Sequence, residues 1–174
     1  MRRRFASRLA GVTAVVAVVA ACASISHGVR AATATATLTV SVTVSVNCTV
    51  STSPLNFGSY DPVVANASTA LDGTGTVSVA CTKGATATAG LDLGSNASGS
   101  TRRMADGSSN YLNYEIYSDS SRTTVWGNSG GSLVALGAAP SKTARNVTAY
   151  GRVTANQDVP AGSYSDTVTA TVTF

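Results

Sequence analysis

The chain has 174 residues, with 12 lysines and arginines, 8 aspartates and glutamates and one histidine, so its formal net charge is +4. Five of the basic residues lie within the first 31 positions: Arg2, Arg3, Arg4, Arg8 and Arg30. The rest of the chain therefore has 12 − 5 = 7 basic residues against 8 acidic ones. The later basic residues are scattered, with Arg102 and Arg103 as one adjacent pair. The basic patch that a nucleic-acid binder needs is therefore missing from the sequence.

Residues 1–31 have the features of an export signal. A basic start precedes an apolar stretch of 13 residues, Leu9–Ala21, which is shorter than the about 20 residues of a membrane-spanning helix. Cleavage after Ala31 fits a small-residue site. Two other signals overlap with this one, because Val19–Cys22 matches a bacterial lipobox and Arg2–Phe5 resembles part of a twin-arginine signal. We predict a signal peptide, with these two alternatives left open.

A long alternating run follows, from Ala32 to Val50, in which every even-numbered residue is apolar and nearly every odd one is Thr or Ser. Strict period two is typical of a β-strand with one buried face. The run has 19 residues and would span roughly 60 Å, whereas a usual strand has about 5–6 residues. We expect two strands that follow each other with no turn residues between them, and the second, near Val44–Val50, should be part of this domain. The alternative is that both strands join one sheet of this chain after a bend, although the run contains no Gly or Pro.

The rest of the chain shows strand patterns separated by clusters of Gly, Ser, Asn and Asp. The predicted strands are Thr74–Cys81, Thr86–Leu93, Tyr111–Tyr117, Asn146–Ala155 and Thr167–Phe174. No stretch after residue 31 has a helical period. Strands at this spacing, joined by polar turns, predict an all-β protein with two antiparallel sheets packed as a sandwich.

Two cysteines, Cys48 and Cys81, remain once the signal is removed. In an exported chain such a pair predicts one disulfide, which would join the first strand of the domain to the second long one. Closing this loop would stabilise the fold by about 3–4 kcal/mol on the chain-entropy estimate. The alternatives are two free thiols or half of a metal site, and the mature chain has no further Cys or His to support them.

One segment, Gly127–Gly131 with the sequence GNSGG, fits the G-x-S-x-G pattern of a serine nucleophile. Such a serine requires a base, but the one histidine, His27, lies in the predicted signal. The two mature lysines, Lys83 and Lys142, lie in no catalytic motif, and the carboxylates lack the spacing of a calcium loop. We therefore predict a turn at Ser129 and a protein that is not an enzyme, without catalytic residues, metal, cofactor or small-molecule substrate.

Several motifs then occur in a familiar order: Cys48–Val50 at the end of the alternating run, LNFGSYDP at Leu55–Pro62, GTVSVACTKG at Gly75–Gly84, Arg103–Met104, YLNYEIYSD at Tyr111–Asp119, Trp126–Gly127 and the ending Ala149–Phe174. Together they resemble the spore coat protein U domain family, which includes subunits of the archaic chaperone–usher pili of Gram-negative bacteria. The resemblance covers about the whole mature chain. It implies an incomplete immunoglobulin-like β-sandwich that lacks its last strand and therefore has an apolar groove.

In these pili a periplasmic chaperone fills the groove first, and the N-terminal extension of the next subunit then replaces it by donor-strand complementation. The resemblance implies a donor-strand extension at 32–43 and a pilin domain at 44–174. The donor side chains would be Ala34, Ala36, Leu38, Val40 and Val42. Four side chains of the last strand would face the groove or the chaperone: Val168, Ala170, Val172 and Phe174.

The function implied is that of a structural pilus subunit, exported to the periplasm and polymerised at the cell surface, which supports adhesion or biofilm formation. Its expected partners are neighbouring copies or related subunits, the periplasmic chaperone and an outer-membrane usher. Two alternatives stay open. The first is a secreted spore-coat or envelope protein of the same fold, and the second is a tip adhesin.

Overall fold

The computed structural model describes residues 28–174. The core of the predicted signal peptide, with its lipobox and twin-arginine alternatives, lies outside the described residues. Residues 42–174 form one compact unit, and the described residues before it, 28–41, contain no helix or strand. Within 28–174 no helix is long and apolar enough to cross a membrane, and the one helical element is the three-residue 3-10 helix η1, Gly130–Ser132.

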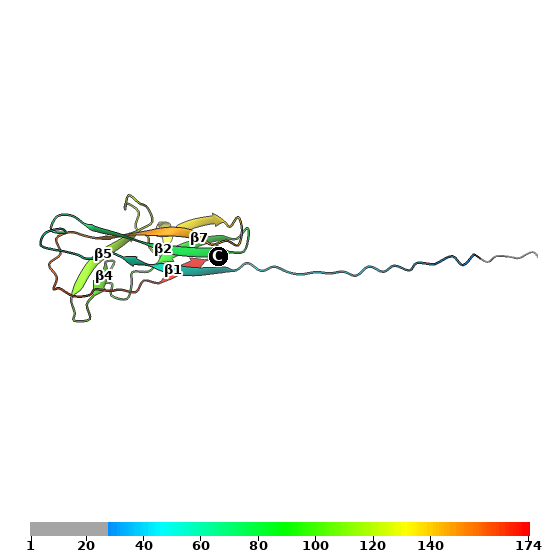
Figure 1. Ribbon diagram of the computed structural model, residues 1–174, viewed down its shortest axis with the longest axis horizontal. Helices are drawn as coiled ribbons and strands as arrows, with labels where there is room; N and C mark the ends of the chain where they lie inside the picture. The colour runs from blue at the N-terminus through cyan, green and yellow to red at the C-terminus, as the bar shows by residue number, and fades with distance from the viewer. Residues whose placement is uncertain (1–27) are drawn as a thin grey trace, which may run out of the picture. The chain divides into compact units, whose positions relative to one another are not determined.

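The strands build two antiparallel sheets (Figure 1). The five-stranded sheet has the order β1-β2-β7-β5-β4, from β1 (Cys48–Asn56), β2 (Leu71–Cys81), β7 (Arg145–Val153), β5 (Tyr111–Tyr117) and β4 (Arg102–Ala105). The three-stranded sheet has the order β6-β3-β8, from β6 (Val134–Ala138), β3 (Thr86–Leu91) and β8 (Ala170–Thr173). The predicted all-β sandwich is confirmed.

The start of the first strand differs from the prediction. We expected it near Val44, but β1 begins at Cys48 and continues to Asn56, and residues 28–47 belong to no strand. The reason is the length of its partner, because β2 ends at Cys81, directly opposite Cys48. The alternative that Ala32–Val50 forms two strands of its own sheet is therefore wrong.

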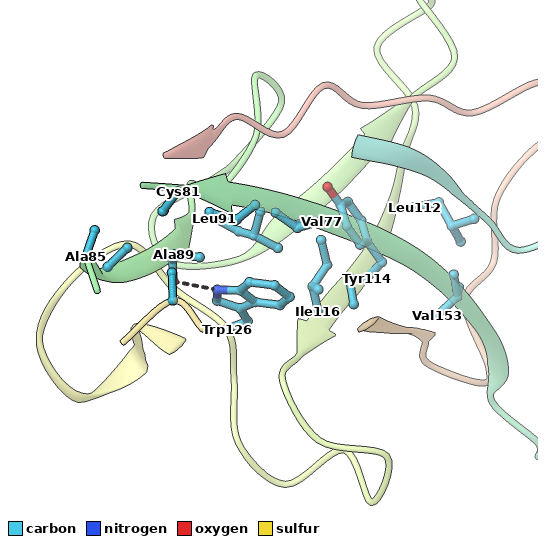
Figure 2. Packing of buried hydrophobic residues seen from close by; sticks show 14 residues of the cluster. Val77, Cys81, Ala85, Ala89, Leu91, Leu112, Tyr114, Ile116, Trp126 and Val153 are labelled. Carbon is cyan, nitrogen blue, oxygen red and sulfur yellow. Dashed lines mark hydrogen bonds between the residues drawn. The ribbon is translucent and has the colours of Figure 1, made fainter. Parts of the chain in front are cut away.

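The core lies between the two sheets and surrounds one tryptophan (Figure 2). Val77 and Val79 face it from β2, and Ala89 and Leu91 face it from β3. Trp126 is fully buried, and its Nε1 donates a hydrogen bond of 3.0 Å to the main-chain oxygen of Ala89. This bond pairs the polar atom that burial of an indole would otherwise leave without a partner.

Cys48 and Cys81 form the predicted disulfide, with their Cα atoms 4.1 Å apart. The alternatives of free thiols and of a metal-ligand pair are therefore wrong. The bond links positions 33 residues apart, which corresponds to about 3–4 kcal/mol of stabilisation. The main-chain N–H of Thr82 donates to the oxygen of Asn47 at 2.9 Å, one step beyond the strand. The chain is thus anchored where it enters the sheet.

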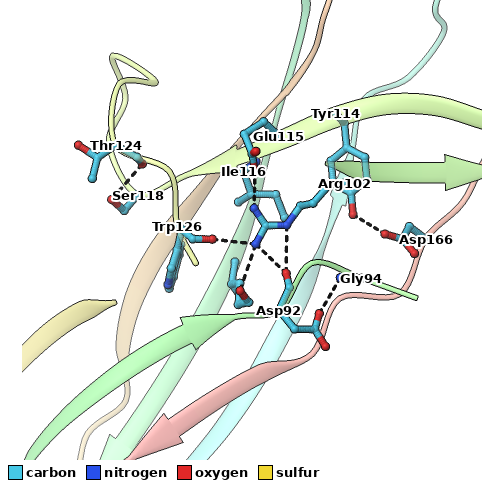
Figure 3. Close-up of polar contacts among 11 residues, drawn as sticks. Asp92, Gly94, Arg102, Tyr114, Glu115, Ile116, Ser118, Thr124, Trp126 and Asp166 are labelled. Atoms are coloured by element: carbon cyan, nitrogen blue, oxygen red, sulfur yellow. Dashed lines mark hydrogen bonds and ion pairs between the residues drawn. The ribbon is translucent and has the colours of Figure 1, made fainter. Parts of the chain in front are cut away.

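A buried arginine, which no sequence pattern indicates, ties the two sheets together on the side of β4 and β5 (Figure 3). Arg102 on β4 has no exposed surface and forms an ion pair with Glu115. Its Nη2 donates to the main-chain oxygens of Leu91 at 3.1 Å and Trp126 at 2.8 Å. Its Nε donates to that of Asp92 at 3.0 Å. We call these groups the Arg102 cluster, and its bonds are what allow a charge to be buried there.

Candidate functional site: an open groove between β1 and the C-terminal segment

Each of the two sheets has a free strand edge at one side of the sandwich. β1 is the end strand of the five-stranded sheet, and β8 is the end strand of the three-stranded sheet. Within residues 28–174, β1 pairs only with β2 and β8 pairs only with β3. The two strands contact each other, so their free edges lie on the same side. A free edge is where a further strand can add to a sheet.

A hollow of about 410 Å³ lies between the second half of β1 and the segment that precedes β8. Its floor consists of core side chains from both sheets, among them Val77, Leu91 and Ile116. The segment Thr52–Phe57 forms one wall, and the segment Tyr164–Val168 forms the other. Folded proteins pack with few voids larger than a water molecule, so a hollow of this size over the core leaves room for a further segment.

A second hollow, of about 760 Å³, continues the first toward the end of β1. The two share the lining residues Leu55, Asn56, Phe57, Met104 and Tyr164. The second is also lined by the core residues Leu112 and Val153 and by the loop segment 159–162. Together the two hollows form one trough, which we call the open groove.

The β1 wall of the open groove is irregular. The register between β1 and β2 shifts around Pro54, which has no N–H to donate and is therefore suited to an edge. Leu55 and Phe57, which follow, are half-buried and pack on Gly151 of β7. A Cβ atom at position 151 would lie 2.7 Å from the ends of both side chains, so a larger residue would push them out of their present positions. Glycine thus lets these two side chains form part of the groove lining.

The C-terminal wall alternates strictly, because even-numbered residues from Tyr164 to Val172 are half-buried and odd ones are exposed. Val168 lines the open groove, Ala170 and Val172 pack against the core, and Phe174 is 55% exposed. The proposed contacts of these four side chains with a donor strand or a chaperone stay a prediction.

The strand in this wall is shorter than Thr167–Phe174, the predicted range. The residues just before β8 form hydrogen bonds with a loop and with β4, and they form no continuous ladder with a neighbouring strand. Ser95 N–H donates to the oxygen of Thr167 at 3.1 Å, and Asp92 N–H donates to that of Thr169 at 3.1 Å. Ser165 forms an isolated bridge with Ala105. The wall is therefore held without a regular ladder.

A carboxylate fixes the middle of this wall (Figure 3). The phenol of Tyr114 on β5 donates to Oδ2 of Asp166 at 2.7 Å. The main-chain and side-chain nitrogens of Asn96 each donate to Oδ1 at 3.1 Å. Burial, together with this hydrogen bond to a carboxylate, raises the pKa of Tyr114 far above its usual range. These bonds attach the C-terminal wall to the five-stranded sheet and hold it at the border of the groove.

The predicted donor side chains lie before the first strand. Ala34, Ala36, Leu38 and Val40 belong to residues 28–41, and Val42 is the first residue of the compact unit. Leu38, Val40 and Val42 are 88%, 85% and 88% exposed. The structure describes a single copy of the chain, and their predicted role in a second copy remains a prediction.

Other candidate chemistry does not converge on a site. Ser129 lies in the turn before η1, and its main-chain oxygen accepts a hydrogen bond from Ser132 Oγ at 2.6 Å. Among residues 28–174, no group of three His, Cys, Asp or Glu side chains is placed to hold a metal ion. The residues that sequence reasoning missed are those that line the groove, chiefly Leu55, Phe57, Met104 and Tyr164. The alternation in Leu55–Phe57 and from Tyr164 onward was the available signal.

Three comparisons with known proteins bear on this arrangement. The family model described as the Spore Coat Protein U domain matches residues 34–171. Protein U of Myxococcus xanthus is 43% identical over 179 aligned positions, which cover 93% of this chain and 97% of that protein.

The fold is also similar to a chain in the crystal structure of the CsuC–CsuE chaperone–tip adhesion subunit pre-assembly complex, from the archaic chaperone–usher Csu pili of Acinetobacter baumannii. That match has a TM-score of 0.56 and 23% identity, and it covers 76% of this chain and 41% of the other. At this identity the likeness establishes the fold. The family match and the relative confirm the predicted resemblance, and the chain belongs to the Spore Coat Protein U domain family.

Proposed function

We propose that the chain is an exported structural subunit that polymerises by donor-strand complementation at the surface of a Gram-negative bacterium. The observation that carries this proposal is the open groove, with hollows of about 410 and 760 Å³ over the core, bordered by the free strand β1 and by the segment that precedes β8. The occupant would be the extension 32–43 of another copy or of a related subunit. The same extension would leave its own domain at the disulfide-anchored start of β1.

The chemistry of extension and groove is complementary. The extension alternates apolar and hydroxyl side chains, as a strand that lies on an apolar floor requires. Burial of Leu38, Val40 and Val42 would each contribute about 1.5–3 kcal/mol. The free edge of β8 would supply main-chain hydrogen bonds. Ala34 and Ala36 would fill shallower parts of the groove.

The topology favours one direction for the added strand. β8 runs toward the disulfide end of the domain, because Thr173 pairs with Thr88 near the start of β3. The three-stranded sheet is antiparallel throughout, so an added strand would run the opposite way, along the direction of β1. Its C-terminal end would leave the open groove near Asn56.

A periplasmic chaperone would occupy the groove before assembly, and an outer-membrane usher would catalyse the exchange. Support comes from the resemblance of the chain and from the fold it shares with a structure described as a chaperone–subunit complex of archaic chaperone–usher pili. The assembled pilus would serve adhesion or biofilm formation. The subunit would pass through the periplasm on its way to the cell surface.

A charge on the buried face of the extension tests this proposal. In cells with the chaperone and usher, Val40→Asp should abolish polymers while the chaperone complex of the subunit still forms. Thr39→Asp is the matched control, because it places the same charge on the opposite face of the strand, and its polymers should persist. Deletion of residues 33–42 should act like Val40→Asp. Normal polymers from either variant would overturn the proposal.

A second candidate is a coat or envelope protein of the same fold that is not built into a pilus. The family description and the 43% identity to Protein U of Myxococcus xanthus favour it. Chaperone and usher genes beside the gene for this chain would favour the pilus, and their absence would favour the coat. Electron microscopy of the native assembly distinguishes fibres from a surface layer.

A further inference from the structure

A rigid loop at the far end of β1 exposes two adjacent valines. Asp61 Oδ1 accepts hydrogen bonds from the main-chain N–H of Val63 at 2.9 Å and of Val64 at 3.1 Å. Asn66, which is buried, accepts a bond from Asp61 N–H at 2.9 Å and donates one to the oxygen of Thr69 at 2.9 Å. These bonds fix the loop conformation without using either valine side chain.

Val63 and Val64 are 81% and 76% exposed. Single exposed apolar residues are common on protein surfaces, but here two neighbours lie in a turn whose backbone is held by the hydrogen bonds of Asp61 and Asn66. The loop also borders the open groove, because Pro62 lines the second hollow. The valine pair therefore lies beside the point where an added strand would leave the groove.

The opposite end of the compact unit carries a second exposed pair. Val44 is 76% exposed and Val46 is 58% exposed. Their backbone is tied to the domain, because Thr82 Oγ1 donates to the oxygen of Ser45 at 3.3 Å and accepts from Asn47 N–H at 3.1 Å. This pair directly precedes β1, while the Val63–Val64 loop follows it. The two pairs thus lie at opposite ends of the same strand.

We propose that Val63 and Val64 of one copy pack against Val44 and Val46 of the next copy in the polymer. Two different complementary patches at opposite ends of a subunit make a head-to-tail contact, which propagates as a filament. This inference rests on the proposed function, since the donor segment ends at residue 42 or 43 as it leaves the groove. Residues 44–46 of the donor copy would then emerge beside the Val63–Val64 loop of the acceptor.

A paired-cysteine experiment tests the contact in polymers made by the full chain with its own chaperone and usher. Val44→Cys and Val64→Cys in one chain should give a ladder of disulfide-linked multimers on a non-reducing denaturing gel. Each single substitution should give no ladder, since one site cannot link copies in series. Val44→Cys with Val125→Cys is the matched control, because Val125 is also exposed, at 41%, but lies in another loop. That combination should give no ladder either.

Polymers of Val44→Cys/Val64→Cys without a ladder would overturn the contact, and so would a ladder of equal strength in the control. Dimers from Val64→Cys alone would also overturn it, because they would indicate a symmetric contact or a different partner for the loop. Adding Val40→Asp separates the two proposals. Polymers that persist with Val40→Asp contradict donor-strand assembly whatever the ladder shows.

A second measurement does not rely on new cysteines. Val63→Ser/Val64→Ser should still give polymers, but with a shorter persistence length in electron micrographs than those of the wild type. Val125→Ser should leave the persistence length unchanged. Equal stiffness in all three would contradict the contact.

Discussion

Two regions of the sandwich differ in how the core between the sheets is covered. On the side of β4, the Arg102 cluster and the indole of Trp126 bridge the sheets, and the buried nitrogens of both side chains have partners. Beside β1 and the segment that precedes β8, core side chains instead face the open groove, whose lining extends to Met104 of β4. Because the sheets are bridged so closely around Arg102 and Trp126, the open groove is a specific feature of this fold and does not reflect loose packing throughout.

The largest effect is expected from breaking the Arg102 cluster. Arg102→Met should lower the free energy of unfolding by about 3–5 kcal/mol, because it removes a buried charge from Glu115 and leaves main-chain oxygens unpaired. Urea denaturation of the purified subunit measures this. Arg103→Met is the matched control, since Arg103 forms no ion pair within residues 28–174: it stacks on Tyr111, with its guanidinium carbon 3.9 Å from the ring centre, and its Nε donates one hydrogen bond of 3.0 Å to the main-chain oxygen of Asn96. Arg103→Met should lower the free energy of unfolding by about 0.5–1 kcal/mol. Equal decreases for Arg102→Met and Arg103→Met would contradict the special role of the Arg102 cluster.

On the side of β1, the disulfide should carry most of the local stability. Replacing both Cys48 and Cys81 by serine should lower the free energy of unfolding by about 3–4 kcal/mol. Hydrogen exchange should rise first in β1, which has one strand partner and mostly exposed side chains. A uniform rise across both sheets would show instead that the bond stabilises the whole fold evenly.

A groove-wall residue should matter more in the polymer than in the free subunit. Leu55→Ala should destabilise the free subunit by about 1–2 kcal/mol, because its side chain is only half-buried over the groove. A fully buried core residue such as Ile116 should cost about 2–5 kcal/mol when cut to alanine. In denaturation of the polymer, Leu55→Ala should be more destabilising than Ile116→Ala, since an inserted strand would cover Leu55. An unchanged order would argue against an occupied groove.

The smallest effect concerns the outer face of the five-stranded sheet. Hydrogen bonds from Arg152, at 2.8 and 2.9 Å, hold the pKa of Asp72 below its ordinary value of 3.8. The stabilisation is therefore present above that value and is lost as the pH falls through the lower pKa of the folded state. Asp72→Asn should cost about 0.5 kcal/mol at pH 7, because the pair is partly exposed. The difference should vanish in acid, as urea denaturation at several pH values would show.

Period-two alternation was enough to predict the sandwich, and β5 was predicted to the residue. It failed for β4, whose inward-facing residue is Arg102, because a buried charge has the pattern of a surface position. It failed for β6, Val134–Ala138, where a glycine and two exposed alanines weaken the signal.

Part of the candidate site could likewise be predicted from the sequence, and part could not. The disulfide followed from counting cysteines in an exported chain, and the apolar face of 32–50 followed from its periodicity. The groove could not be predicted residue by residue, because its walls come from segments more than 100 residues apart, such as Leu55 and Tyr164. Only the fold brings these segments together.

In the proposed polymer the extension of one copy fills the open groove of another, and cross-linking tests this arrangement directly. A photoreactive amino acid in place of Leu38 would be activated in polymers assembled from a mixture of isotope-labelled and unlabelled chains. The account predicts cross-links between differently labelled copies, at groove residues such as Leu55, Met104 and Tyr164. Cross-links confined to single copies, or to surfaces outside the open groove, would contradict it.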